Sequence, residues 1–205
     1  PGASAQTLAD RATGYIGSFE TQHGTREVGV PLLVHRRCAE PMFSVSNAIA
    51  YENLMVQAKQ PKPSSLLDAA GASRWIDISG RAQGKWCPQE GEYVLQLLQS
   101  IRNSGCEPDL YLVTPFVDVQ NGLRSLLVSS PVLVGWVPNP YAWVNERVGT
   151  VHTVQGREAE AVIFVLGAPE SAQRGARAWA GKTPNLLNVA VTRAKEAVYV
   201  VGNRE

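Results

Sequence analysis

The last third of the chain, residues 148–203, constrains the fold most, because strand-like and helix-like segments alternate there. The run AVIFVLG at 161–167 is apolar at nearly every position, which is typical of a strand covered on both faces. The segment VGTVHT at 148–153 predicts a strand before it, and Gly156 marks the turn between them. A further apolar run, AVYVVG at 197–202, predicts a third strand. This order favours a largely parallel sheet.

The segment between the last two of these strands predicts a buried helix. Thr183 is a suitable N-cap, and Pro184 suits the first helical position because its missing N–H would have no partner there. The rest of the helix is apolar nearly all round, apart from one polar stripe formed by Asn185, Asn188 and Thr192. A helix with that pattern is buried against other elements.

Arg193 follows directly at the end of this buried helix. A buried guanidinium group costs desolvation energy unless it meets an anion. The local pattern leaves two interpretations open. The arginine either forms a structural ion pair with Glu158 or Glu160, or it is held rigidly to meet a phosphate group.

Composition places the chain among ordinary α/β domains. It has 205 residues, 44% of them hydrophobic and 18% charged, which is enough for one domain with a sizeable core. A net charge of +1 is too small to indicate a nucleic-acid partner by itself. Cys38, Cys87 and Cys106 lack metal-ligand spacing, so we expect no metal site and a cytoplasmic location. Without a long apolar run, we expect no membrane partner.

The segments VHTVQGRE at 151–158 and NVAVTRAK at 188–195 resemble motifs V and VI of superfamily 1 DNA/RNA helicases. The resemblance is to the branch that includes the nonsense-mediated-decay helicase. It implies an α/β fold, a RecA-like three-layer sandwich with helices on both faces of a largely parallel sheet. It also implies that residues 31–205 form the second RecA-like domain, with residues 1–30 as an N-terminal linker or extension.

The same resemblance assigns the nucleotide contacts of motifs V and VI. Arg193 takes the place of the motif VI arginine, which reaches across a domain cleft to the γ-phosphate of ATP and neutralises charge during phosphoryl transfer. Glu158 matches the motif V acid that contacts the ribose. Gln155 and Gly156 match the pair that shapes the turn.

The stretch HRRCAEP at 35–41 resembles the glutamine–tyrosine–arginine segment that opens this domain in the family. On that match Arg37 takes the place of a second arginine that contacts the γ-phosphate. Arg36 stands where many relatives carry an aromatic residue that stacks on adenine, and a guanidinium group can also stack. His35 stands at the glutamine position.

The resemblance also places nucleic acid on two segments. Thr114 and Pro115 match motif IV, a strand end that leads into a helix near nucleic acid. Thr114 either binds a phosphate through its hydroxyl group or simply caps the helix, and both interpretations stay open. His152 and Thr153 match the motif V segment that lies near the nucleic-acid backbone.

Several segments are less informative. We expect loops at 19–30 and 57–73, and a helix after Pro41 that is capped by Ser44 or Ser46. The basic segment 170–181 is either a flap towards nucleic acid or a solvated insert. Three aromatic residues either stack on bases or anchor a loop on the core: Trp136, Tyr141 and Trp143.

Neither glycine–lysine pair in the chain has the spacing of a phosphate-binding loop, and no acidic pair follows an apolar strand. We therefore expect ATP and Mg²⁺ to be held by a first RecA-like domain in a longer parent protein, and single-stranded DNA or RNA to bind across both domains. The chain alone should not hydrolyse ATP. The alternative is a RecA-like module that only binds nucleic acid or protein.

Overall fold

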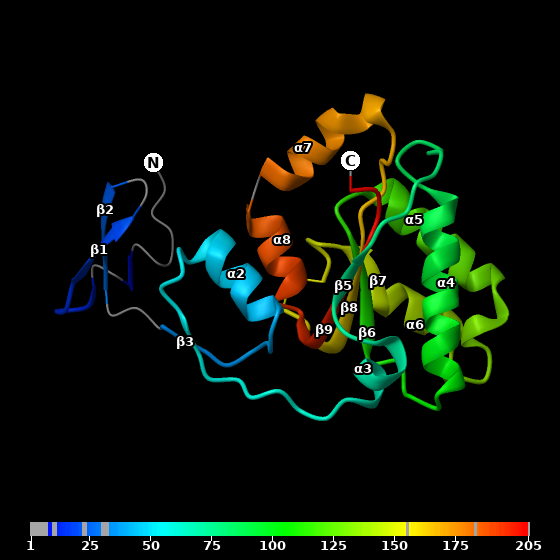
Figure 1. The fold of residues 1–205 in the computed structure, drawn as a ribbon, viewed down its shortest axis with the longest axis horizontal. Helices are drawn as coiled ribbons and strands as arrows, with labels where there is room; N and C mark the ends of the chain where they lie inside the picture. The colour runs from blue at the N-terminus through cyan, green and yellow to red at the C-terminus, as the bar shows by residue number, and fades with distance from the viewer. Residues whose placement is uncertain are drawn as a thin grey trace.

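The computed structural model describes residues 8–9, 12–21, 24–29, 33–154, 156–182 and 184–204. Its main sheet has five strands in the spatial order β5-β9-β8-β6-β7, and every pairing in it is parallel (Figure 1). The strands are β5 (Arg74–Ile76), β6 (Leu110–Thr114), β7 (Val148–Thr150), β8 (Ala159–Val165) and β9 (Ala194–Val201). The parallel sheet expected from the apolar runs is therefore confirmed.

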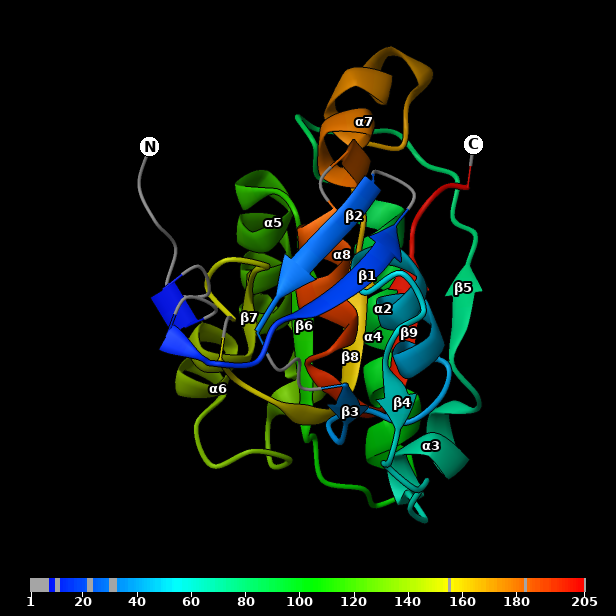
Figure 2. The same ribbon diagram turned by 90° about the vertical axis from the view of Figure 1, so that its left-hand side faces the viewer.

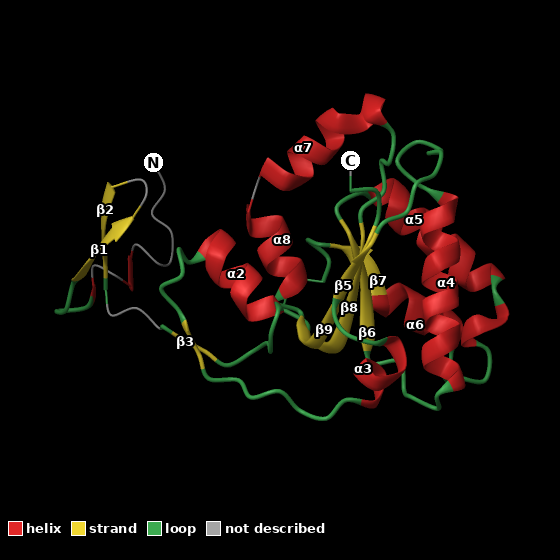
Figure 3. Cartoon of the chain, viewed as in Figure 1, coloured by secondary structure: helices red, strands yellow, loops and turns green. Residues whose placement is uncertain are grey.

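Helices cover both faces of this sheet (Figure 3). One face carries α3 (Ser65–Ala70), α4 (Pro88–Asn103), α5 (Val117–Ser129) and α6 (Pro140–Arg147). The other face carries α2 (Met42–Ala50) and α8 (Pro184–Val191). Helix α7 (Arg174–Lys182) lies over the edge of the sheet where the strands end. Two short 3-10 helices, η1 (Pro131–Leu133) and η2 (Ser171–Gln173), complete the described elements.

Strand β6 shows how the sequence builds two cores. Its five residues are all buried, as expected for a central strand. Leu110 and Leu112 pack in the larger core with α4 and α5, whereas Tyr111 and Val113 pack in the smaller core with α2 and α8. Alternate side chains of a strand point to opposite faces, so an uninterrupted apolar run supplies both layers. The three-layer α/β sandwich is confirmed.

The loop expected at 19–30 is wrong for most of its length. Strands β1 (Gly17–Thr21) and β2 (Gly24–Val28) form an antiparallel hairpin there, with Gly17 opposite Val28. Gly24 has a φ of 106°, which glycine adopts without strain and which helps the chain reverse. Figures 1 and 2 place this hairpin beyond α2 from the sheet.

The expected caps of α2 are also wrong. Pro41 is the N-cap residue, and Ser44 and Ser46 lie inside the helix. Their hydroxyl groups have other partners, because Ser44 donates to the Glu40 carboxylate at 2.8 Å and Ser46 donates to Asn188 Oδ1 at 2.6 Å. Neither hydroxyl group is therefore available to cap the helix: one bonds to the residue just before the N-cap, and the other bonds to α8.

The expected loop at 57–73 contains regular structure. Strand β4 (Val56–Gln57) pairs in parallel with β3 (Val34–His35), and α3 follows. Ser64 caps α3, because its hydroxyl group accepts a hydrogen bond from Leu67 N–H at 2.9 Å. Both elements are short, and short elements give little periodicity for a sequence pattern to reveal.

Candidate nucleotide cleft and nucleic-acid edge

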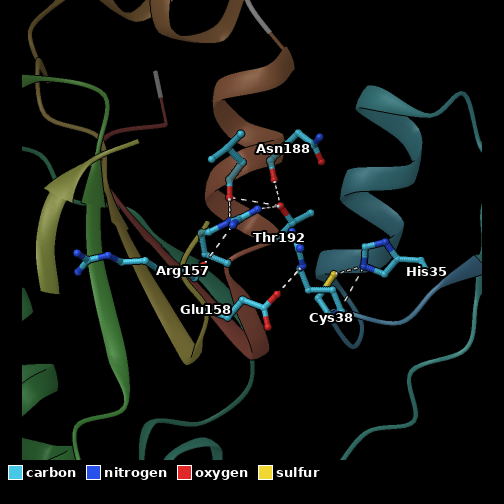
Figure 4. A network of polar contacts seen from close by, with 9 residues as sticks. His35, Cys38, Arg157, Glu158, Asn188 and Thr192 are labelled. Atoms are coloured by element: carbon cyan, nitrogen blue, oxygen red, sulfur yellow. Dashed lines mark hydrogen bonds and ion pairs between the residues drawn. The ribbon is translucent and has the colours of Figure 1, made fainter. Parts of the chain in front are cut away.

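A cleft with a volume of about 880 Å³ opens beside the starts of β8 and β9. Three segments that are far apart in the sequence meet in it: the loop after β3, the turn before β8 and the end of α8 (Figure 4). Its cationic side chains outnumber the carboxylates Glu158 and Glu196; they are Arg36, Arg37, Lys59, Lys62, Arg193 and Lys195. Such a lining attracts a multiply charged anion.

Arg193 is held rigidly in the wall of this cleft, with only 6% of its surface exposed. Its Nε donates to Val189 O at 3.1 Å, and its Nη1 donates to Arg157 O at 3.3 Å. Burial lowers the pKa of Arg193, as does the charge of Arg37, while Glu158 opposes this shift. Among the described residues, neither Glu158 nor Glu160 forms an ion pair with it. The ion-pair interpretation is therefore wrong, and backbone carbonyl groups position the guanidinium group.

Arg37 pairs with Glu158 across the cleft. Arg37 Nε lies 2.6 Å from Glu158 Oε1, and the two side chains remain 44% and 35% exposed. Arg37 follows β3 and Glu158 directly precedes β8, so this pair joins two of the three segments. Arg37, Glu158 and Arg193 all line this one cleft.

The loop after β3 is bonded directly to the chain after α8. Ala39 N–H donates to Lys195 O at 2.9 Å, and Ser46 in α2 bonds to Asn188 in α8. Phe43 and Leu186 lie in the same apolar cluster, which joins α2 to α8. Arg37 and Arg193 are consequently carried on one packed unit.

His35 shapes the loop that carries Arg36 and Arg37. Its Nε2 accepts a hydrogen bond from Cys38 N–H at 3.3 Å and lies 3.0 Å from Cys38 Sγ. Burial and the nearby Arg37 lower the pKa of His35, which favours the neutral ring. Cys38 is fully buried, and burial raises the pKa of its thiol to about 11. Arg36 is exposed at the cleft.

The turn of motif V is described only in part. Gln155 lies outside the described residues. Gly156 has a φ of 87°, a conformation that favours glycine. Arg157 points away from the cleft in Figure 4, and its Nη1 donates to Glu146 O at 3.1 Å.

The segments expected near nucleic acid meet at the other end of the sheet. Thr114 lies opposite Thr150 where β6 and β7 end, and the next turn exposes His152 and Thr153. Thr114 itself is fully buried, and its Oγ1 accepts a hydrogen bond from Phe116 N–H at 3.3 Å.

The motif IV segment therefore presents little of itself to solvent. Pro115 is buried like Thr114, and Phe116 rather than Thr114 is the N-cap residue of α5. The Thr114 hydroxyl group stabilises the turn before the helix. Exposed side chains at this edge are supplied by the turn after β7.

Two of the three aromatic residues in 131–149 anchor that segment. Trp136 Nε1 donates to Cys106 O at 2.7 Å, and Trp143 packs against the larger core. Tyr141 is 66% exposed and lines a groove between α5 and α6.

Sequence reasoning did not identify the far wall of the cleft. Lys59 and Glu196 form an ion pair of two largely buried side chains there, and Lys62 N–H donates to Glu196 Oε2 at 3.3 Å. Lys59 and Lys62 belong to a proline-rich stretch with no pattern of its own. No sequence signal could have joined them to a residue so far along the chain.

The described residues show neither a metal-binding cluster nor a membrane-spanning helix. No group of three or more His, Cys, Asp or Glu among them is arranged to hold a metal ion. Cys38, Cys87 and Cys106 are free and buried. No helix in the described ranges is long and apolar enough to cross a membrane.

A family model for an AAA domain matches residues 19–205. The chain belongs to this AAA domain family. The match confirms the expectation of a helicase-type C-terminal RecA-like domain. The AAA domain is also similar to a solved structure, the C-terminal domain of a possible DNA helicase from Lactobacillus plantarum WCFS1, with 12% identity and a TM-score of 0.47 over 82% of this chain and 87% of that chain. Comparison with curated proteins gave no match.

Proposed function

We propose that this AAA domain is the second motor domain of an ATP-dependent superfamily 1 helicase. Residues 31–205 form the motor domain and residues 1–30 form an extension. The observation that carries the proposal is the cleft in which Arg37, Glu158 and Arg193 converge.

The cleft suits a triphosphate shared with a second domain. Its cationic lining complements the phosphate charges, while the described residues hold no acidic cluster for Mg²⁺. A first RecA-like domain of the same protein would supply the phosphate-binding loop and hold Mg²⁺, which neutralises charge on the phosphates. ATP would then lie between the two domains.

The two arginines have different parts in this proposal. Arg193 is already fixed by carbonyl groups, so it can stabilise charge that develops on the γ-phosphate without further ordering. Arg37 reaches the same phosphate group by leaving Glu158, which is then free to meet the ribose. Arg36 offers a flat guanidinium surface to the base. Gly156, with its positive φ, shapes the turn that carries Glu158, and Gln155 precedes it in the motif.

Single-stranded DNA or RNA is the second proposed partner. It would follow the edge where β6 and β7 end, contacting His152 and Thr153, with Thr114 and Pro115 supporting the turn beneath. The nucleotide cleft lies at the start of β8 and β9, so a strand of seven residues, roughly 23 Å long, separates the two sites. Domain closure on ATP could shift the nucleic acid by acting through this rigid sheet.

An NMR titration of the chain tests the nucleotide half of the proposal. We expect Mg-free ATP and tripolyphosphate to shift the guanidinium resonances of Arg37 and Arg193 but not those of Arg157, which points away from the cleft. Binding should weaken as salt rises, because the contacts are ionic. Shifts confined to the groove between α5 and α6 would refute the assignment.

A further inference from the structure

Helix α7 carries an exposed aromatic residue over the end of the sheet. Trp179 is 53% exposed, and its ring centroid lies 6.1 Å from that of Phe116 with 31° between the ring planes. Phe116 is only 7% exposed. The buried ring therefore supports one side of the indole, while much of the indole remains open to solvent.

The helix holds Trp179 in a defined place. Ala176 and Ala180, on the same side of α7, pack against the larger core. The segment before α7 is fastened to the loop at 80–86, because the Glu170 carboxylate accepts a hydrogen bond from Ala82 N–H at 2.8 Å and Gln173 Nε2 donates to Gly84 O at 2.6 Å. An aromatic side chain on so fixed a helix needs little ordering on binding.

Cationic groups border this aromatic pair. Lys85 Nζ lies 5.4 Å from the centroid of the Phe116 ring and keeps 41% of its side chain exposed. Asp118 Oδ2 lies 3.9 Å from Lys85 Nζ and partly neutralises the charge of the lysine. Arg174, at the start of α7, is exposed. An open indole next to a lysine, on a helix that begins with an exposed arginine, suits a base that stacks and a phosphate that pairs.

The location of Trp179 and Phe116 in the fold indicates which ligand they would bind. Phe116 comes two residues after Thr114, at the end of β6, and so belongs to the edge that we assign to nucleic acid. We propose that Trp179, backed by Phe116, is a stacking platform for a base of single-stranded nucleic acid, with Lys85 and Arg174 facing its phosphates. This inference rests on the proposed function and adds a binding residue outside motifs IV, V and VI.

The test measures how the 205-residue chain binds fluorescein-labelled dodecamers of deoxythymidine and of uridine at low salt, by fluorescence anisotropy. Trp179→Leu keeps an apolar side chain but removes the stacking surface, and we expect it to weaken binding by about tenfold, within the range for one stacked base. Trp179→Phe should retain most of the affinity. The two oligonucleotides show whether DNA or RNA is preferred.

Tyr141→Leu is the matched control, because Tyr141 is 66% exposed, compared with 53% for Trp179, but lies over the groove between α5 and α6. It should bind like the wild type, and thermal unfolding should show that every variant is folded. If the wild type binds and Trp179→Leu binds equally well, or if Tyr141→Leu loses as much affinity, the platform is wrong and the proposed function stands. If the wild-type chain binds neither oligonucleotide, both the stacking platform and the proposed nucleic-acid edge are refuted.

Discussion

Glu158 holds Arg37 through a contact of 2.6 Å, whereas Arg193 in the same cleft is held by the carbonyl groups of Val189 and Arg157. The difference matters for an incoming anion. A phosphate must compete with a carboxylate for Arg37, but it meets in Arg193 a guanidinium group whose place is fixed by neutral acceptors. The two arginines should therefore respond differently to substitution of their neighbours.

Glu158→Gln tests this competition. The ion pair is partly exposed, so its loss should change the free energy of unfolding by less than about 1 kcal/mol. Binding of tripolyphosphate should tighten, because a negative charge leaves the cleft, whereas ATP should gain less because the ribose contact is lost. Calorimetric titration of both ligands measures the contrast. An equal gain in affinity for tripolyphosphate and for ATP would show that Glu158 does not contact the ribose.

Arg193→Ala should reduce ATP turnover by roughly 10³–10⁵-fold in the protein that joins this domain to a phosphate-binding one. Arg193→Lys should restore little, because an ammonium group cannot reproduce the planar fork. Arg157→Ala removes the same charge from the exposed side of the neighbouring turn and should leave turnover nearly unchanged. Phosphate release measures all three. Comparable losses in Arg157→Ala and Arg193→Ala would show that only charge matters.

The chain alone should not hydrolyse ATP. The arginines can neutralise phosphate charge, but hydrolysis also needs a loop that holds the phosphates, a held Mg²⁺ and a positioned water. Phosphate release should stay at background with or without single-stranded DNA or RNA. Activity that copurifies with the chain and disappears in Arg193→Ala would mean that the chain is a complete enzyme.

Glu90 is a buried carboxyl group in the first turn of α4. Its Oε2 accepts a hydrogen bond from Gly167 N–H at 2.8 Å, and its Oε1 has no partner among the described residues. Burial raises the pKa of Glu90 from 4.5 to about 7, although the Gly167 hydrogen bond and the charge of Arg177 oppose the shift. Between these two pH values the folded chain keeps a proton that the unfolded chain releases.

Stability should therefore fall as pH rises from about 4.5 to about 7, by up to roughly 3 kcal/mol from this group. Glu90→Gln should flatten that part of the pH profile and make the chain more stable than the wild type at about pH 8. Urea unfolding at several pH values measures the slope. Glu92→Gln, exposed on the same helix, should keep the wild-type slope. Parallel profiles for Glu90→Gln and the wild type would contradict the assignment.

Gly122 should resist substitution because of Trp86. A methyl group at Gly122 would lie 2.3 Å from Cδ2 of the Trp86 ring. Gly122→Ala should lower the free energy of unfolding by about 1–3 kcal/mol through overpacking. Gly175→Ala places the same methyl group on α7 where nothing lies within 4 Å, and should raise stability by up to about 1 kcal/mol. Chemical denaturation measures the free energy of unfolding of both variants and of the wild type.

The centre of the sheet could be predicted from sequence because β6, β8 and β9 contain apolar runs that need no partner to be recognised. The hairpin of β1 and β2 could not, since its strands are brief and polar, and α3 could not, since its six residues are too few to show a helical period. For the cleft, the resemblance brought Arg37, Glu158 and Arg193 together. It could not reveal that backbone oxygens hold Arg193, because a carbonyl group is the same in every residue. Nor could it reveal that Thr114 is buried.

The hydrogen bond from Ala39 N–H to Lys195 O has a consequence for timing. It fastens the loop that carries Arg37 to the residues that follow Arg193, so neither arginine can travel far without the other. Their backbones should approach a phosphate group in one movement, and the release of the Arg37 side chain from Glu158 is a separate step that follows.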